Sequence, residues 1–233
     1  MEDKNLSDSE LYEARFGYKS NRSNHRFYAV ILAVFTLFLG LRTYWVQTFG
    51  GIVVDGPSMM QTLQNKDKLL MRYASESVEL ERGDIIVVDV RSYPECGSTD
   101  FLIKRLIAIE GDSVYCENGD LYIKYAGNEN YESQPLFEDY AYYADGKESY
   151  SFAEYEVGEG EIFFLGDNRQ RSKDSRFRET GCSHLPDRLY KEEDVYGVVP
   201  KWALENKKIL EIFVFHDFTR LISKAKAIYR EIF

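Results

Sequence analysis

The sequence predicts a mainly β domain that follows one N-terminal transmembrane helix and ends in a helical tail. Short apolar runs, separated by Gly-Asp and Asn-Gly turn signals, recur through the middle of the chain. Aromatic residues make up 15% of the sequence and are led by 18 tyrosines, a residue type that is enriched in strands. One longer uncharged run lies near the N-terminus. The 233 residues therefore divide into a leader, an anchor, a β domain and a tail.

The predicted anchor covers 27–46 and follows a polar leader at 1–26. Its core, FYAVILAVFTLFLGL (27–41), carries no charge, but a helix needs about 20 apolar residues to cross a bilayer. Extending the helix through Trp45 closes most of this gap, because Arg42 can snorkel to the headgroups. We therefore expect a single-pass protein whose anchor contacts the lipid bilayer.

The residues before the anchor predict its orientation. After Glu13, the last acidic residue before the anchor, four residues are basic: Arg15, Lys19, Arg22 and Arg26. Their charge predicts a cytoplasmic N-terminus at the cell membrane and an extracytoplasmic remainder. A cleaved signal peptide and a buried core helix are the alternatives. The long polar leader and the lack of a small-x-small site directly after the run argue against the first, and the basic flank argues against the second.

The β domain is expected over 47–200. Seven runs have the length and composition of strands: KLLMRY (68–73), DIIVVDV (84–90), FLIKRLIAI (101–109), SVYC (113–116), LYIKY (121–125), EIFFL (161–165) and VYGVV (195–199). Asn118-Gly119 separates two of these runs and predicts a tight hairpin.

Two segments depart from the strand pattern. Residues 126–160 are rich in Tyr, Glu, Asp and Gly, which predicts a long surface excursion with some strand over 150–157. In the tail, 201–233, apolar residues recur at helical intervals between Leu210 and Tyr229. We expect the tail to form a helix that packs on the domain, or that docks on the membrane surface.

Charge and cysteine content exclude several classes of protein. The 39 acidic residues against 29 basic ones give a net charge of −10, which repels nucleic-acid backbones. The three cysteines, Cys96, Cys116 and Cys182, form no CxxC pair, so a zinc site or a redox motif is not expected. One disulfide would suit an extracytoplasmic domain, but the sequence favours three unbridged thiols. Neither a metal nor a cofactor is expected.

Lys104 is a candidate general base. It lies within FLIKRLIAI, and alternation along a strand would place it on one face with Leu102, Leu106 and Ala108, opposite Arg105. An apolar face lowers the pKa of a lysine, and a neutral amine can accept a proton. The plainer interpretation is a lysine that snorkels off an edge strand or pairs with an acid, and Lys104 alone favours it.

Ser58 is a candidate nucleophile. It lies in DGPSMMQTL, where Gly56 and Pro57 predict a shaped turn, although a capping or turn serine would fit equally. A nucleophilic serine needs a base. The histidines are not placed for this role, since they precede the anchor, lie in a polar loop or lie in the tail: His25, His184 and His216. A desolvated lysine is the known alternative.

Three motifs together resemble one family. GPSMMQTL (56–63), then RGDIIVV (82–88) with FLIKRLIAIEGD (101–112), then GDNRQRSKDSR (166–176) follow one N-terminal anchor in that order. Alone, the last motif is only a charged loop with Asp–Arg pairs. As a set they resemble the bacterial type I signal peptidases, roughly over residues 27–200, and GDN-R-x-x-S-x-D-S-R is the most specific of the three.

The resemblance implies a signal-peptidase-like β fold with Ser58 as nucleophile and Lys104 as general base. It also implies support for the base: Ser172 would hydrogen-bond it, Asp174 would hold this support, and Arg176 would be the ion-pair partner. The turn beneath the site would comprise Asp167, Asn168 and Arg169. Pockets for small residues would be lined by Val54, Met59, Leu102 and Ile103. The oxyanion hole would rest largely on the Ser58 N–H, because Gly56 has no side chain that could donate.

Some positions depart from the family pattern. Gln61 stands where proline is usual, and Ala108 and Glu110 stand where Gly and Pro are usual. None belongs to the expected Ser-Lys pair, so their effect would fall on loop rigidity or substrate preference.

The resemblance implies removal of signal peptides from secretory preproteins after small-x-small sites, through an acyl-enzyme on Ser58. Three alternatives remain. A self-cleaving repressor would need a DNA-binding helix-turn-helix in place of the anchor. A eukaryotic-type signal peptidase would carry histidine where Lys104 stands. A binding module on an inactive protease fold would be favoured by loss of Ser58 or Lys104, and both are present.

Overall fold

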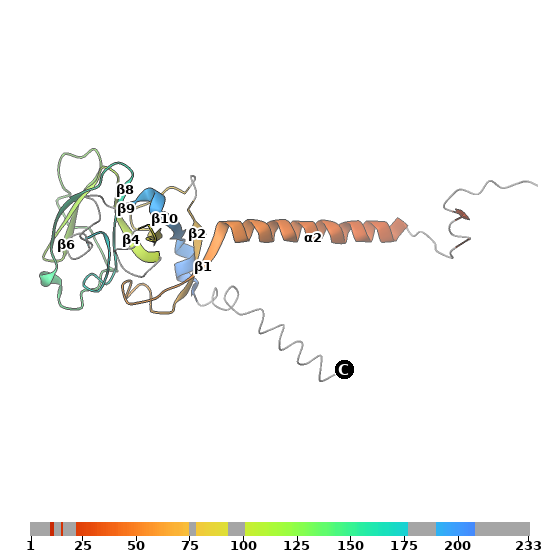
Figure 1. Ribbon diagram of the computed structural model, residues 1–233, viewed down its shortest axis with the longest axis horizontal. Coiled ribbons are helices and arrows are strands. Elements are labelled where there is room, and N and C mark those ends of the chain that lie inside the picture. The colour runs from red at the N-terminus through yellow and green to blue at the C-terminus, as the bar shows by residue number, and fades with distance from the viewer. Residues whose placement is uncertain are drawn as a thin grey trace, which may run out of the picture. The chain divides into compact units, whose positions relative to one another are not determined.

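The computed structural model describes residues 10–11, 15, 22–74, 78–92, 101–176 and 190–207. The chain divides into two compact units, Met1–Gln47 and Thr48–Phe233. The first contains most of helix α2, which spans Arg22–Thr48, and the second contains the strands (Figure 1).

Helix α2 contains the predicted anchor and runs two residues beyond it. Its segment His25–Thr48 is 24 residues long and reaches a mean hydropathy of 1.8. The most apolar part of this segment is not buried against the rest of the protein. By length and composition, it is the one helix among the described residues that could cross a membrane. This is consistent with a membrane-anchored protein.

The second unit is mainly β, as the sequence predicts. Its larger sheet has seven strands in the order β1-β2-β10-β3-β4-β8-β9, and every neighbouring pair is antiparallel. These strands span Phe49–Val53 (β1), Lys68–Tyr73 (β2), Ile85–Asp89 (β3), Phe101–Ile109 (β4), Glu161–Leu165 (β8), Tyr190–Lys191 (β9) and Val195–Val199 (β10).

A smaller sheet has the order β6-β5-β7, with Ser113–Glu117 (β5), Asp120–Lys124 (β6) and Phe152–Glu156 (β7). The predicted hairpin joins β5 to β6. Asn118 and Gly119 have φ angles of 51° and 81°, the left-handed values that a two-residue type I′ turn requires.

All seven predicted strands are present, whereas β1 and β9 are strands that the sequence analysis did not predict. β1 continues the apolar anchor sequence without a turn signal, and β9 has only two residues. Short elements are also present: 3₁₀ turns at Lys147–Ser149 and Glu192–Asp194, and helix α3 at Lys201–Glu205. The predicted helical tail from 208 onward lies outside the described residues.

Alternation along β4 separates two parts of the core. Leu106 pairs with Phe164 and Ala108 with Phe163, so the strand has a bulge at Ile107. Leu106 therefore packs with one hydrophobic cluster and Ala108 with another. The prediction that Ala108 shares the face of Lys104 is wrong, because a bulge residue reverses the alternation beyond it.

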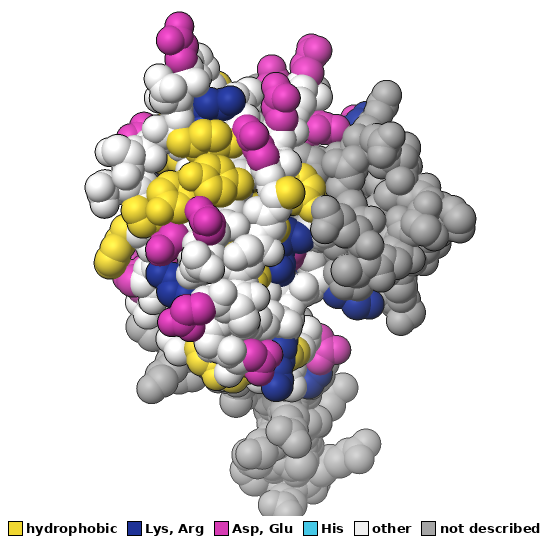
Figure 2. All heavy atoms as spheres, turned by 90° about the vertical axis from the view of Figure 1, so that its left-hand side faces the viewer, with side chains coloured by type: hydrophobic (Ala, Val, Ile, Leu, Met, Phe, Trp, Pro, Cys, Tyr) yellow, Lys and Arg dark blue, Asp and Glu magenta, His cyan; other side chains and the backbone are white. Residues whose placement is uncertain are grey.

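The surface of the second unit reflects the acidic composition. Acidic side chains are spread around hydrophobic ones on the face that carries the smaller sheet (Figure 2). The predicted excursion follows β6 and contains the short 3₁₀ turn before β7. It is only partly a surface segment, because the Glu138 side chain is 5% exposed.

Candidate active site

Ser58 lies in the turn that follows β1, and two hydrogen bonds from one residue hold this turn. The Asn168 backbone N–H donates to the Ser58 carbonyl oxygen at 3.0 Å, and the Asn168 side-chain amide donates to the Pro57 carbonyl oxygen at 3.2 Å. Gly56, at φ 100°, begins the turn. Among the described residues, no hydrogen bond uses the Ser58 backbone N–H. That N–H is available to an incoming oxyanion.

Lys104 lies in β4 opposite Ile86 of β3 and reaches the Ser58 side chain. Its Nζ is 2.9 Å from Ser58 Oγ and also donates to the Ile103 carbonyl oxygen at 2.9 Å. The residue is 3% exposed. Burial lowers the pKa of Lys104 to about 8, although the charges of Asp174 and Asp167 act in the opposite direction.

This arrangement is compatible with a serine nucleophile and an amine base. At pH 7 about a tenth of an amine with pKa 8 is neutral, and a neutral amine has a lone pair for the Ser58 proton. The sequence suggested this pairing only through a resemblance. The structure places the two atoms within hydrogen-bond distance although 46 positions separate them in the chain.

The loop after β8 carries the proposed support residues. Asp174 accepts a 3.2 Å hydrogen bond from the Gly166 N–H and two hydrogen bonds from the Arg176 side chain, at 2.7 and 2.8 Å. Arg176 also donates to the Arg169 carbonyl oxygen at 2.9 Å. The acid and its ion-pair partner therefore lie together and connect Gly166, at the start of this loop, to Arg169 and Arg176 further along it.

Ser172 differs from its expected role. Its Oγ is buried and has no hydrogen-bond partner among the described residues, so the expected bond to Lys104 is not formed. The Lys104 amine donates instead to Ser58 and Ile103. Ser172 still lies close to the site, because a Cβ added at Gly166 would be 2.1 Å from Ser172 Oγ and 2.6 Å from the Ser58 carbonyl oxygen.

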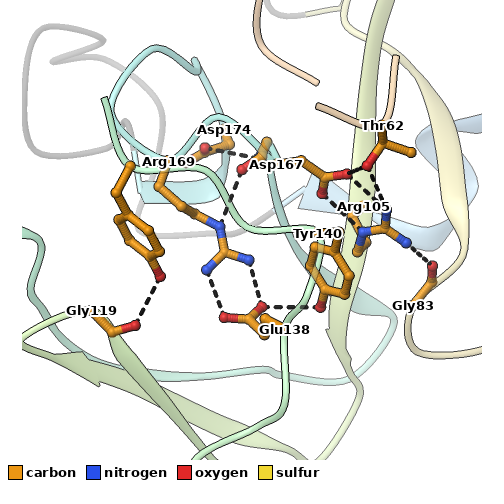
Figure 3. A network of polar contacts seen from close by, with 11 residues as sticks. Thr62, Gly83, Arg105, Gly119, Glu138, Tyr140, Asp167, Arg169 and Asp174 are labelled. Atoms are coloured by element: carbon orange, nitrogen blue, oxygen red, sulfur yellow. Dashed lines mark hydrogen bonds and ion pairs between the residues drawn. The ribbon is translucent and has the colours of Figure 1, made fainter. Parts of the chain in front are cut away.

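Arg105 is a site residue that sequence reasoning missed. It points away from Lys104 and donates to Asp167 at 2.9 and 2.7 Å, while the Thr62 hydroxyl donates to the same carboxylate at 2.5 Å (Figure 3). Arg105 also donates to the Gly83 carbonyl oxygen at 2.8 Å. This network joins β4, the nucleophile segment and the loop after β8.

A second buried network joins this loop to the excursion. Arg169 is inaccessible and donates to both carboxylate oxygens of Glu138, at 2.8 and 2.5 Å. Burial opposes the Arg169 charge, but the hydrogen bonds to Glu138 outweigh it and raise the pKa of Arg169. The Tyr140 ring lies near both arginines (Figure 3). Its centroid is 3.8 Å from the Arg105 Cζ and 6.0 Å from the Arg169 Cζ. No sequence signal singled out Glu138 or Tyr140.

A groove of about 580 Å³ opens beside Ser58 and Lys104. We call it the Ser58 groove. Three of the four predicted pocket residues line it: Val54, Leu102 and Ile103. Met59 does not, because its side chain is fully buried in the core with Leu63 and Leu69. Adjacent residues in the turn point in opposite directions, so the position after the nucleophile serves packing.

The remaining candidate groups lie away from the Ser58–Lys104 pair or outside the described residues. Cys116 is a buried free thiol, and burial raises its pKa to about 11. Cys96, Cys182, His184 and His216 lie outside the described residues. Where the chain is described, no group of three His, Cys, Asp or Glu residues could hold a metal ion.

Comparison with known proteins identifies the family of the chain. The family described as "Signal peptidase, peptidase S26" matches residues 25–210. The chain is 34% identical over 152 residues to Signal peptidase I of Bacillus licheniformis, covering 64% of this chain and 75% of that protein. It is 30% identical over 208 residues to Signal peptidase I P of Bacillus subtilis subsp. natto, covering 85% of this chain and 90% of that protein.

A solved signal peptidase I from Enterococcus faecalis is 27% identical, with a TM-score of 0.36 over 53% of this chain and 98% of the other. The family match extends from within helix α2 to beyond α3 and includes Ser58, Lys104 and the loop after β8. The chain therefore belongs to the signal peptidase family, peptidase S26, among the type I enzymes.

Proposed function

We propose that this enzyme removes signal peptides from secretory preproteins with a Ser58–Lys104 dyad, cutting after small-x-small sites. The observation that carries the dyad is the 2.9 Å contact between a buried amine and the Ser58 hydroxyl. Family membership supports the class of substrate.

In the proposed reaction, Ser58 Oγ attacks the scissile carbonyl carbon while Lys104 Nζ takes the hydroxyl proton. The Ser58 N–H donates to the oxyanion of the tetrahedral intermediate. Lys104 then passes the proton to the leaving amine, and the C–N bond breaks to leave an acyl-enzyme. Water, deprotonated by the same amine, attacks the ester and restores the serine.

The proposed specificity rests on the apolar wall of the Ser58 groove. Val54, Leu102 and Ile103 would accept small side chains in front of the scissile bond. Large side chains at the same positions would collide with a sheet that pairs on both sides of β4. Replacing either small substrate residue by leucine should therefore lower kcat/KM.

We further propose that 1–26 is cytoplasmic, that 27–46 spans the membrane once, and that 47–200 forms an extracytoplasmic peptidase domain followed by the tail, 201–233. The apolar length of α2 and the basic residues before it support this topology. Protease digestion of right-side-out vesicles should remove the domain and spare the leader. Protection of the domain would reverse the proposed orientation.

The dyad is tested with the full-length protein in detergent and a preprotein that carries an Ala-x-Ala site. Ser58→Ala and Lys104→Ala should each reduce turnover by about 10³-fold or more while leaving the fold intact. Ser133→Ala is the matched serine control, because this residue is exposed in the excursion and does not line the Ser58 groove. Lys201→Ala is the matched lysine control, because this exposed residue begins α3.

Two outcomes separate the dyad from the broader function. Substantial activity of Lys104→Ala at neutral pH would exclude Lys104 as the base while leaving a signal peptidase. A wild-type chain that binds the preprotein without cutting it would instead favour a binding module on an inactive protease fold.

Ser172 is proposed as a positioning residue. Its hydroxyl has no partner in the described part of the chain, so Ser172→Ala removes no hydrogen bond that stabilises the free protein. If Ser172 aims the Lys104 amine during the reaction, the variant will lose kcat and retain its melting temperature. Rescue by threonine would identify the hydroxyl as the group responsible.

A further inference from the structure

The Ser58 groove carries basic side chains in an otherwise acidic protein. Arg171 and Lys173 line it from the loop after β8, and both are exposed. The chain as a whole has a net charge of −10, and acidic side chains are spread over the surface seen in Figure 2. Cations at this place are therefore not a consequence of a basic surface.

Arg171 is available to a ligand. In the part of the chain that the structure describes, its guanidinium makes no hydrogen bond and no ion pair, and only its backbone N–H is bonded, to the Asn168 carbonyl oxygen. The other arginines of this loop have acidic partners. Arg169 forms an ion pair with Glu138, and Arg176 forms one with Asp174. A guanidinium presents a fork of donors that fits a carboxylate.

The acid that lines the groove does not cancel these charges. Asp55 lines it too, but its carboxylate accepts a 2.6 Å hydrogen bond from Lys66, with which it forms an ion pair. Arg171 therefore adds positive charge to the groove beside the buried Lys104. Such a groove favours a substrate that brings negative charge.

The position of these cations along the chain places them next to the nucleophile. They flank Ser172, whose side chain lies against Gly166 close to the Ser58 carbonyl oxygen. The apolar lining comes from other segments, namely β1 and the residues after it, β2, β3, the start of β4 and β10. The groove thus has an apolar wall and a cationic loop.

We infer that Arg171, together with Lys173, is a specificity determinant that favours an acidic side chain within the first three residues of the mature protein. This rests on the proposed cleavage after small-x-small sites. The two small residues carry no charge, and the residue between them points away from the groove in an extended peptide, because successive side chains alternate. A carboxylate that meets the loop therefore comes from the mature side of the cut.

The test uses the full-length enzyme and matched peptides that span an Ala-x-Ala site. Each pair differs by Glu against Gln at one position: the middle x, or the first, second or third mature residue. The readout is the ratio of kcat/KM for the Glu peptide to that for the Gln peptide. Because both peptides meet the same enzyme preparation, this ratio is insensitive to partial misfolding of a variant.

For the wild type we expect a Glu/Gln ratio of kcat/KM of about three to ten at one of the mature positions. This is the size of preference that a partly exposed ion pair with the substrate would give. It should fall towards one as salt is raised to about 1 M, where charges are screened beyond a few ångströms. Arg171→Glu should bring the ratio to one or below, and Lys173→Glu should lower it less. Lys201→Glu makes the same change in net charge outside the groove and should leave the ratio unchanged.

A ratio of one at all mature positions in the wild type, or a preference at the middle x, would overturn the inference. An equal fall of the ratio in Lys201→Glu would also overturn it, since long-range charge would then be responsible. These results are distinguishable from a failure of the proposed function, in which neither the Glu nor the Gln peptide would be cut after its Ala-x-Ala site.

Discussion

Arg169 and Glu138 form an ion pair that is almost completely removed from solvent, with side chains 0% and 5% exposed. The arginine belongs to the loop that also holds the Ser58 segment, and the glutamate belongs to the excursion between β6 and β7. A segment without regular strands thus helps to support the candidate active site. Substitutions in the excursion should therefore affect catalysis.

Glu138→Gln should destabilise the protein. The substitution leaves the buried Arg169 guanidinium without its counter-charge, and breaking one side of a buried pair costs about 3–5 kcal/mol. We expect a lower melting temperature and a matching loss of the free energy of unfolding in urea. Glu132→Gln, at an exposed position of the same segment, is the control. Equal stability of the two variants would contradict the structural role of Glu138.

The pH dependence of cleavage should report Lys104. Burial lowers its pKa to about 8, so the amine is charged below that pH and neutral above it. Activity should therefore rise about tenfold per unit at acidic pH and level off above about pH 8. The measurement is kcat/KM from pH 5.5 to 9.5. A profile that stays flat from pH 6 to 9 would exclude a titrating base of this kind.

Asp174→Asn should shift this profile to lower pH. The Asp174 charge raises the Lys104 pKa against the effect of burial, so removing it makes the neutral amine more stable. The substitution also leaves Arg176 with a weaker partner, and a melting curve will show the resulting loss of stability separately. Asp139→Asn, an exposed position, should leave the profile in place. A shift to higher pH in Asp174→Asn would contradict the electrostatic explanation.

Gly166→Ala should reduce activity by about 10²-fold, because small displacements of reacting groups are costly. The added Cβ would lie 2.6 Å from the Ser58 carbonyl oxygen, a distance that forces the nucleophile segment or the Ser172 side chain to move. At Gly158 the added Cβ would meet only the flexible end of the Glu161 side chain, at 3.0 Å. Gly158→Ala is therefore the control. Comparable activity of both variants would show that the loop after β8 can rearrange to accept the added methyl group.

The Cys116 thiol should resist alkylation in the folded protein. It is buried, and burial raises its pKa to about 11, so little thiolate exists at pH 8. In a Cys96→Ser, Cys182→Ser background, a maleimide reagent should label Cys116 only after urea unfolds the chain. Rapid labelling without urea would show that the core around β5 opens readily.

Local patterns predicted most of the fold. Turn signals separate the runs that became β2, β3, β4, β5, β6, β8 and β10, and the left-handed residues Asn118 and Gly119 identify their hairpin directly. β1 was missed because no turn signal separates Phe49 from the apolar helix before it. The strand is specified by its pairing with β2, which is a tertiary interaction.

The site was harder to predict from sequence. Lys104 and Ser58 could be proposed together only because three distant motifs resembled one family. The strand pattern places Arg105 on the face opposite Lys104, but no local pattern identifies its partner Asp167, which lies 62 positions away. Glu138 sits in a segment whose composition indicates solvent exposure, and nothing local pairs it with Arg169. The bulge at Ile107 is likewise set by pairing across the sheet.

The Asn168 bonds to the Ser58 segment have a practical consequence, because they end on main-chain oxygens. The attachment does not depend on which side chain occupies position 58. Ser58→Ala should therefore keep the groove assembled and serve as a trap. Immobilised on a resin, it would retain uncut preproteins long enough for mass spectrometry to catalogue the natural clients of this enzyme.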